Sequence, residues 1–193
     1  MSVRYKCTER TKNKIKLAFL QMTTKKQVNK IFVKEVIEEA GVSRACFYVH
    51  YKNLTAVIHE ISQDTITALL HLTEEKTYTE SLAQEILCNR DLAQYVQENR
   101  NTFSVLLGPY GDPEFLQKWH VHVLEQISGR LQRDNISVNR DIEDMMEFGI
   151  DRVFDVLLRN LENPFDEFFK ALNILDKFML CMVVSMHYQH LKA

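Results

Sequence analysis

The chain has 193 residues, of which 46% are apolar and 26% charged, and it contains no uninterrupted stretch of 18 apolar residues. This composition excludes a disordered chain and a membrane-spanning one, and we expect a cytoplasmic protein. Only 5 Gly and 3 Pro occur, too few turn-forming residues for a sandwich, a barrel or a doubly wound sheet, so the composition predicts an all-α fold.

Charge is unevenly distributed behind a formal net charge of -2. Residues 1–62 contain 12 Lys and Arg against 5 Asp and Glu, whereas residues 63–193 contain 12 against 21. A basic head on an acidic body indicates a module that binds a polyanion, joined to a domain with another role. The alternative is a solvated basic face that has no partner.

Two amphipathic segments open the chain. Segment 9–22 places Ile15, Ala18, Phe19 and Met22 at helical spacing, which predicts a helix with these side chains buried. Segment 32–40 predicts a second helix, with Val33, Val36, Ile37 and Ala40 on its apolar face.

A tight turn and a short helix follow. Gly41 stands where a helix end favours a residue that tolerates positive φ, and Ser43 stands where the next helix needs an N-cap. That helix runs to Tyr51, and a long helix begins near Leu54 with Val57, Ile58, Ile61 and Ile66 on its buried side. Two short helices around such a turn are typical of a helix-turn-helix, whose second helix enters the DNA major groove.

The run from Val33 to Leu54 resembles the DNA-binding signature of TetR-type transcriptional regulators. The similarity rests on the Ala-Gly-Val-Ser turn, the Phe-Tyr-Val-His-Tyr segment and the Lys that follows, and covers about the first 60 residues. It implies an all-helical homodimer of about nine helices, with a three-helix DNA-binding head and a helical-bundle body that dimerises and binds an effector. We therefore expect a DNA-binding domain over 1–53 and an effector-binding and dimerisation domain over 54–193.

The resemblance also implies which residues contact DNA. Three positions depart from the family pattern: Ile37 where a small residue is usual, Cys46 where a hydroxyl is common, and Leu54 where Lys is frequent. Lys52 is expected to take over the phosphate contact of that missing Lys. The predicted DNA-binding residues are Lys34, Ser43, Arg44, Ala45, Cys46, Tyr48, His50 and Lys52.

Turn signals divide the remaining chain into further helices. They are predicted near 54–76, 80–99, 101–107, 113–132, 139–161 and 164–190. The stretch from Asn99 to Phe115 resembles a Firmicutes-type subgroup that includes an activator of dihydroxyacetone kinase genes. Family precedent favours a repressor, and the subgroup keeps activation open. Neither pattern identifies an effector, and Phe103, Tyr110, Phe115, Trp119 and Met145 are better explained as core than as pocket residues.

The last predicted helix is apolar around much of its circumference, which suggests burial against a second copy. Its expected dimer-interface residues are Phe165, Phe168, Leu172, Leu175, Met179 and Met182. The alternative is burial within its own chain.

Catalytic and metal-binding chemistry finds little support. Cys46 and His50 are four residues apart, but no third member lies near them in sequence. Cys181, His187 and His190 could form a metal site, although terminal histidines that face water are the simpler interpretation. We expect no enzymatic activity, no cofactor and no metal. The alternative to a regulator is a helical small-molecule carrier or metal sensor whose basic head is incidental.

Overall fold

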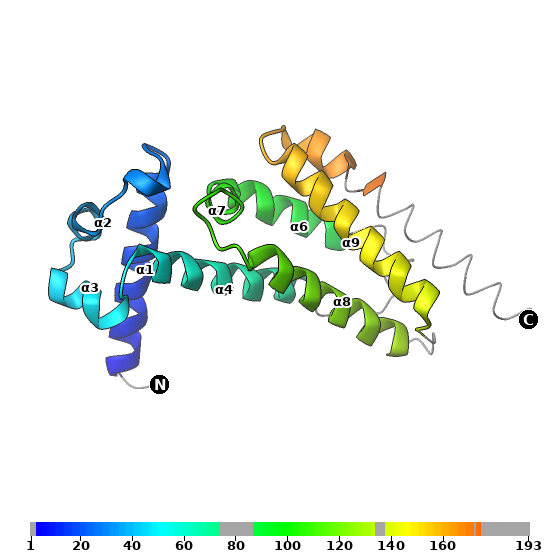
Figure 1. Ribbon diagram of the computed structural model, residues 1–193, viewed down its shortest axis with the longest axis horizontal. Coiled ribbons are helices and arrows are strands. Elements are labelled where there is room, and N and C mark those ends of the chain that lie inside the picture. The colour runs from blue at the N-terminus through cyan, green and yellow to red at the C-terminus, as the bar shows by residue number, and fades with distance from the viewer. Residues whose placement is uncertain (1–2, 74–86, 134–137, 172, 175–193) are drawn as a thin grey trace, which may run out of the picture. The chain divides into compact units, whose positions relative to one another are not determined.

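A computed structural model of the chain describes residues 3–73, 87–133, 138–171 and 173–174. These residues form helices and turns and contain no strand (Figure 1). The all-α prediction is confirmed. The named helices are α1 (Val3–Thr23), α2 (Val33–Ala40), α3 (Arg44–His50), α4 (Leu54–Thr73), α6 (Leu87–Glu98), α7 (Arg100–Leu106), α8 (Phe115–Arg133) and α9 (Arg140–Asn160), with a 3-10 turn η1 (Val28–Lys30).

The described chain forms two compact units. The first takes in the residues up to Thr65 together with Asn101–Phe115, and the second takes in Ile66–Arg100 and the residues from Leu116 onward. In the first unit, the first part of α4 associates with α1 through ion pairs, and residues 101–115 belong to the same unit. The expected division into a DNA-binding domain up to residue 53 and an effector-binding domain after it stays a prediction.

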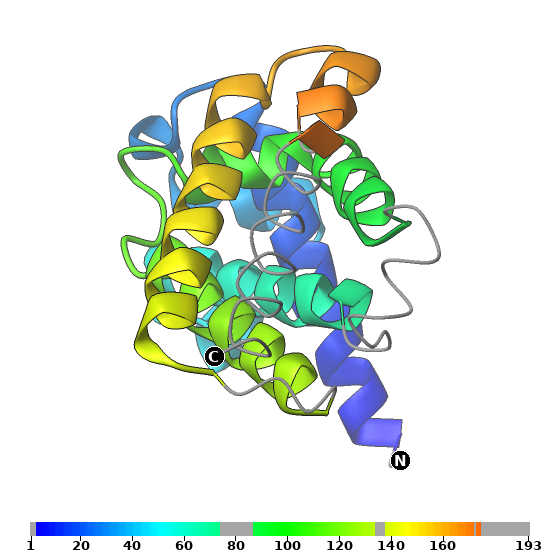
Figure 2. The same ribbon diagram turned by 90° about the vertical axis from the view of Figure 1, so that its right-hand side faces the viewer.

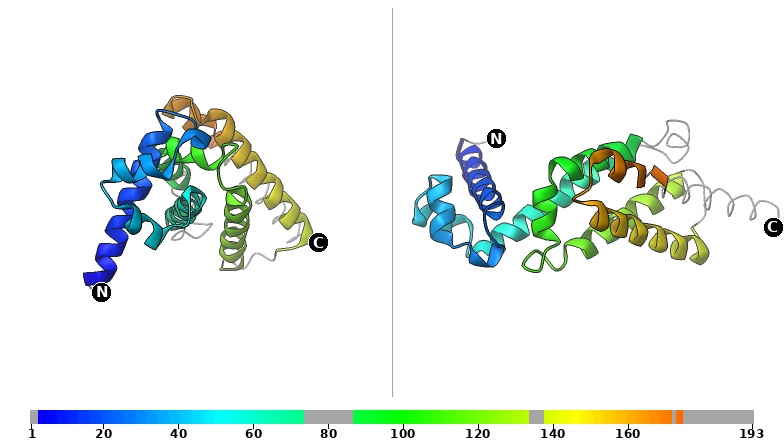
Figure 3. Two further views of the ribbon diagram at one scale, coloured as in Figure 1. Left: turned by 60° about the vertical axis from the view of Figure 1, so that its left-hand side comes forward. Right: turned by 90° about the horizontal axis from the view of Figure 1, so that it is seen from above.

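The core of the first unit contains the apolar faces predicted from helical spacing. Ile15, Ala18, Phe19 and Met22 of α1 are all buried. α2 packs on α1 (Figure 3). Its Val36 is fully buried. On α4, the predicted buried residues Val57, Ile58 and Ile61 also lie in the core. Burial of this apolar surface is the main favourable contribution to the fold.

Segment 101–115 is attached to α1 by polar contacts and contains a buried aromatic pair of its own. The Asn101 side-chain amide donates to the Leu20 carbonyl at 2.9 Å and lies 3.1 Å from Thr23 Oγ1. Phe103 and Phe115 are buried, and their rings meet edge to face with centroids 6.1 Å apart. The segment therefore contributes both to the hydrogen bonding of α1 and to the core of its unit.

The second unit contains α6, α8, α9 and the end of α4 (Figure 2). Trp119 of α8 and Phe154 of α9 are both buried, with ring centroids 4.7 Å apart. The Gln126 side chain donates to the Leu70 carbonyl at 3.3 Å, which connects α8 to the end of α4. α9 begins at an N-cap, where Asn139 Oδ1 accepts from the Ile142 N–H at 3.0 Å.

The expected dimer-interface residues fall mostly outside the described part of the chain. Leu172, Leu175, Met179 and Met182 are in that group. Phe168 is fully buried within its own chain, whereas Phe165 is half-buried and stacks on Phe169 with centroids 5.8 Å apart. The dimer interface stays a prediction, and Phe168 offers no exposed surface to a second copy. None of the described helices is both long enough and apolar enough to cross a membrane.

Candidate nucleic-acid interface

The turn between α2 and α3 is fixed by two backbone hydrogen bonds. Gly41 has φ 62°, in the left-handed region. Its N–H donates to the Glu38 carbonyl at 3.3 Å, and the Val42 N–H donates to the Ile37 carbonyl at 3.1 Å. This pair of bonds is a Schellman motif, which satisfies carbonyls left free at a helix end. The predicted role of Gly41 is confirmed.

α3 starts at the N-cap predicted from the sequence. Ser43 Oγ accepts a hydrogen bond from the Cys46 N–H at 3.1 Å. Because the Ser43 oxygen accepts this hydrogen bond, the main role of the side chain is to cap α3, and a contact with DNA would be additional. The cap and the Schellman turn together set the direction in which α3 leaves α2.

One side chain anchors α3 to the core of its unit. Phe47 is fully buried, and its ring contacts that of Tyr51, which is also buried, at a centroid distance of 5.8 Å. A helix anchored through a single face presents the opposite face to solvent. That exposed face consists of Arg44, Ala45, Tyr48 and Val49.

Arg44 and Tyr48 form a pair on this face. The Arg44 guanidinium lies over the Tyr48 ring, 5.6 Å from its centroid, and the Tyr48 ring meets Phe47 edge to face at 5.4 Å. A cation–π contact of this kind restricts the side-chain rotamers of both residues. The guanidinium N–H donors of Arg44 are therefore held in place by the Tyr48 ring. Arg44 forms no ion pair with the described residues.

The other predicted DNA-binding residues divide by exposure. Lys34 is 81% exposed and only loosely paired with Glu38 at 3.9 Å, and Lys52 is exposed directly after α3. Cys46 and His50 are half-buried at the edge of the exposed face. Among the described residues, no three His, Cys, Asp or Glu side chains come together as a metal site. Cys181, His187 and His190 lie outside the described residues.

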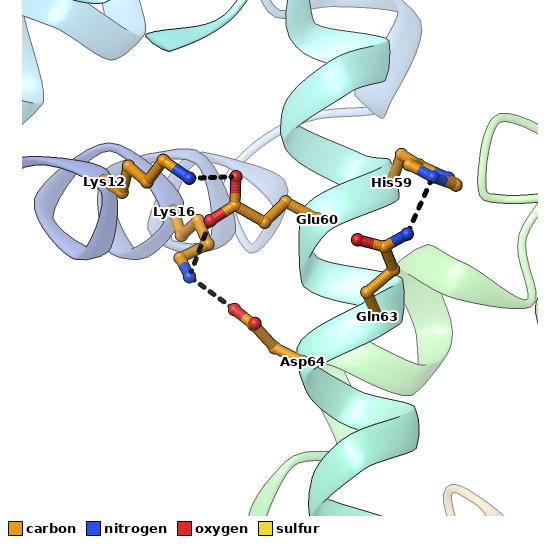
Figure 4. Close-up of polar contacts among 6 residues, drawn as sticks. All are labelled: Lys12, Lys16, His59, Glu60, Gln63 and Asp64. Atoms are coloured by element: carbon orange, nitrogen blue, oxygen red, sulfur yellow. Dashed lines mark hydrogen bonds and ion pairs between the residues drawn. The ribbon is translucent and has the colours of Figure 1, made fainter. Parts of the chain in front are cut away.

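Three other basic residues of the first unit are held in ion pairs. Lys12 Nζ lies 3.2 Å from Glu60 Oε2, Lys16 pairs with both Glu60 and Asp64, and Lys26 pairs with Glu35. Figure 4 shows Glu60 and Asp64 on the side of α4 that faces Lys12 and Lys16. Lys12 and Lys16 hold α1 against α4, and Lys26 connects the turn after α1 to α2. Lys34, Arg44 and Lys52 lie on or directly after α2 and α3 and are exposed to an external anion.

The α1–α4 network also surrounds the residue that ends α3. Burial raises the pKa of the Tyr51 phenol, and the negative charge of Glu60 raises it further. Desolvation acts to raise the pKa of Glu60, but the hydrogen bond from Lys12 and the charges of Lys12 and Lys16 outweigh it, so the Glu60 pKa lies below its usual value. Glu60 is thus a carboxylate and Tyr51 a neutral phenol at neutral pH.

Three residues with a distinct place in the structure were not predicted from the sequence. Asn53 Oδ1 accepts from the Ala56 N–H at 2.9 Å and so caps α4, a role that an Asn just before an apolar helix could have indicated. Val49 lies 78% exposed beside Ala45 on α3, as the helical spacing from Phe47 could have shown. For Glu60, no local pattern indicates a partner 44 residues away.

A hollow of about 480 Å³ lies in the first unit, beside the end of α1 and the turn after α7. Its lining includes Thr23, Lys26, Asn101, Ser104 and Tyr110. Tyr110 is half exposed and its hydroxyl accepts from Asn29 Nδ2 at 3.0 Å, whereas Phe103, Phe115, Trp119 and Met145 are buried, as core residues should be. An effector pocket stays a prediction.

Comparisons with known proteins yield one informative similarity. No family model and no curated protein matches the chain. A solved structure, described as the crystal structure of a TetR transcriptional regulator from Streptococcus agalactiae 2603V, superposes with a TM-score of 0.61. The alignment covers 94% of this chain and 97% of that one at 22% sequence identity. The chain therefore has the fold of that TetR regulator along nearly its whole length.

Proposed function

We propose that the chain is a TetR-type DNA-binding transcriptional regulator. The observation that carries the proposal is the exposed face of α3, where Arg44, Ala45, Tyr48 and Val49 project from a helix held by a Schellman turn, a Ser43 cap and buried Phe47. The full-length similarity to the fold of a TetR regulator adds support. A supported helix with one free face is what a major groove accepts.

Each predicted contact has a distinct role in this proposal. Arg44 reads a guanine through its O6 and N7 atoms, and Lys34, Tyr48, His50 and Lys52 contact phosphates or groove edges. Ser43, Ala45 and Cys46 lie where the helix meets the DNA, with Ser43 also serving as cap. Phosphate contacts supply most of the affinity, whereas base contacts supply the sequence preference.

The regulator acts in the cytoplasm as a homodimer on a roughly palindromic operator, because two copies related by a two-fold axis read two inverted half-sites. A small-molecule effector in the body controls it by favouring one separation of the two heads, with a coupling of about 1–3 kcal/mol. Repression is the proposed outcome. Residues 99–115 resemble a subgroup that includes an activator, so activation is the outcome to test against repression.

The test is a selection of binding sequences from a random duplex pool at two salt concentrations. An enriched inverted repeat, bound by a dimer, is the expected result. Enrichment of no sequence, with weak binding that disappears as salt rises, would overturn the proposal and favour a carrier or sensor whose basic head is incidental.

Two substitutions separate base reading from charge. Arg44→Ala should reduce preference for the selected sequence by about 1–3 kcal/mol. Lys52→Ala should weaken binding to all sequences about equally and lower the salt slope by about one. Lys170→Ala, which removes an exposed charge from the second unit, is the matched control and should leave both properties unchanged.

A further inference from the structure

The exposed face of α3 has a polar half and an apolar half. Arg44 and Tyr48 form the polar half through their cation–π contact. Ala45 and Val49, four residues apart, form the apolar half. At 78%, Val49 is the most exposed large apolar side chain among the described residues.

A single exposed valine is common on protein surfaces, but this one has a particular setting. Ala45 and Val49 are neighbours along one side of the helix, because residues four apart meet on a helix surface. Within the part of the chain that the structure describes, both side chains are exposed, and Phe47 anchors α3 through the opposite face. The pair is therefore free to contact an apolar group on a partner.

Charge argues that the partner is DNA and not a second copy of this face. Arg44 and exposed Lys52 flank the pair, and residues 1–62 carry a formal excess of seven positive charges. The same face of another copy would bring like charges together, which is unfavourable. The phosphates of DNA are negatively charged and attract the same basic residues, so DNA fits this face better than a second copy does.

The major groove contains one apolar group, the C5-methyl of thymine. We propose that Ala45 and Val49 contact thymine methyl groups, so that each operator half-site carries thymine beside the base pair read by Arg44; this inference rests on the proposed function. The Cβ atoms of residues four apart on a helix are separated by about 5–6 Å. Successive bases on one strand rise by about 3.4 Å. The two side chains thus reach methyl groups one or two base steps apart.

The experiment replaces each thymine of the selected operator by deoxyuridine, one position at a time. This change removes the methyl group and preserves base pairing. For the wild-type protein, one or two positions in each half-site should lose affinity by about fourfold, the value of one buried methyl group. For Val49→Ala, the loss at the position opposite residue 49 should disappear.

Two control variants test whether the coupling belongs to Val49. Val121→Ala makes the same chemical change at an exposed valine of α8 and should keep the full deoxyuridine penalty. Lys52→Ala should bind more weakly yet keep the same penalty, because it removes a phosphate contact only. Val49→Ala itself should fold normally, since alanine favours an exposed helix.

The outcomes separate this inference from the proposed function. If an operator is selected but deoxyuridine is neutral at every position, or its penalty is the same in wild type and Val49→Ala, the methyl contact is overturned and the regulator stands. If the wild-type protein selects no sequence, both fail together.

Discussion

Lys16 of α1 meets Glu60 of α4 with 3.5 Å between Nζ and Oε1, although the two residues are 44 positions apart in the chain. Lys12 reaches the other oxygen of the same carboxylate at 3.2 Å, and Asp64 completes the set on the next turn of α4. Lys16 is nearly buried, with 11% of its side chain exposed. A buried ammonium is tolerated only when it is paired, so these two helices are held in one arrangement.

Replacing Glu60 by Gln should therefore destabilise the fold. The neutral amide keeps the size of the side chain but removes the charge that Lys12 and Lys16 share, and we expect the free energy of unfolding to fall by about 1–2 kcal/mol. Urea unfolding followed by circular dichroism measures the change. Glu38→Gln is the matched control, because Glu38 is 64% exposed in a loose 3.9 Å pair. Equal effects of the two substitutions would contradict a bracing role for Glu60.

The same carboxylate should make stability depend on pH in the acid range. Its pKa in the folded protein lies below the ordinary value of 4.5. A lowered folded-state pKa means that the charge stabilises the fold above about pH 4.5 and that this contribution is lost as the pH falls through the folded pKa. Wild-type stability should thus fall more steeply than that of Glu60→Gln between about pH 6 and pH 3. Parallel pH profiles for the two proteins would rule out this linkage.

Substituting alanine at two glycines should change stability in opposite directions. Gly41→Ala places a side chain at φ 62°, where no atom lies within 4 Å of the new Cβ, so the penalty comes from the backbone alone, about 1–2 kcal/mol. Gly129→Ala, in the last part of α8 and also without a close neighbour, should stabilise by about 0.5–1 kcal/mol. Thermal unfolding of both variants provides the comparison. A destabilised Gly129→Ala, or an unaffected Gly41→Ala, would refute this explanation.

A better cap at the start of α2 should stabilise the first unit. Phe32 stands at the N-cap, 67% exposed, and its ring has no acceptor; only Glu35 forms a capping contact, accepting from the Phe32 N–H at 2.9 Å. Phe32→Ser supplies the missing oxygen and completes a capping box, which should add about 1 kcal/mol. The melting temperature reports the gain. Phe32→Ala, which removes the same ring without adding an oxygen, should show no gain, and an equal increase in both variants would exclude the cap as its cause.

Local features of the fold could be predicted from the sequence because they depend on neighbouring residues. Helical spacing identified the buried faces of α1 and α4, and the residue types at Gly41 and Ser43 predicted the turn and the cap. The contact between Lys16 and Glu60 has no local signal, since either residue alone reads as a surface charge. Val49 carries a signal of a different kind: its spacing from Phe47 places it on the free face of α3, but an exposed valine is common on protein surfaces and by itself indicates no partner.

The attachment of segment 101–115 to the first unit limits how this protein can be recombined. A chimera that carries only the first 65 residues onto another body would leave the Leu20 carbonyl without the Asn101 amide and the core without Phe103 and Phe115. The exchangeable unit is discontinuous, so transferring the proposed DNA-binding surface requires either both pieces of chain or a graft confined to the surface of α3.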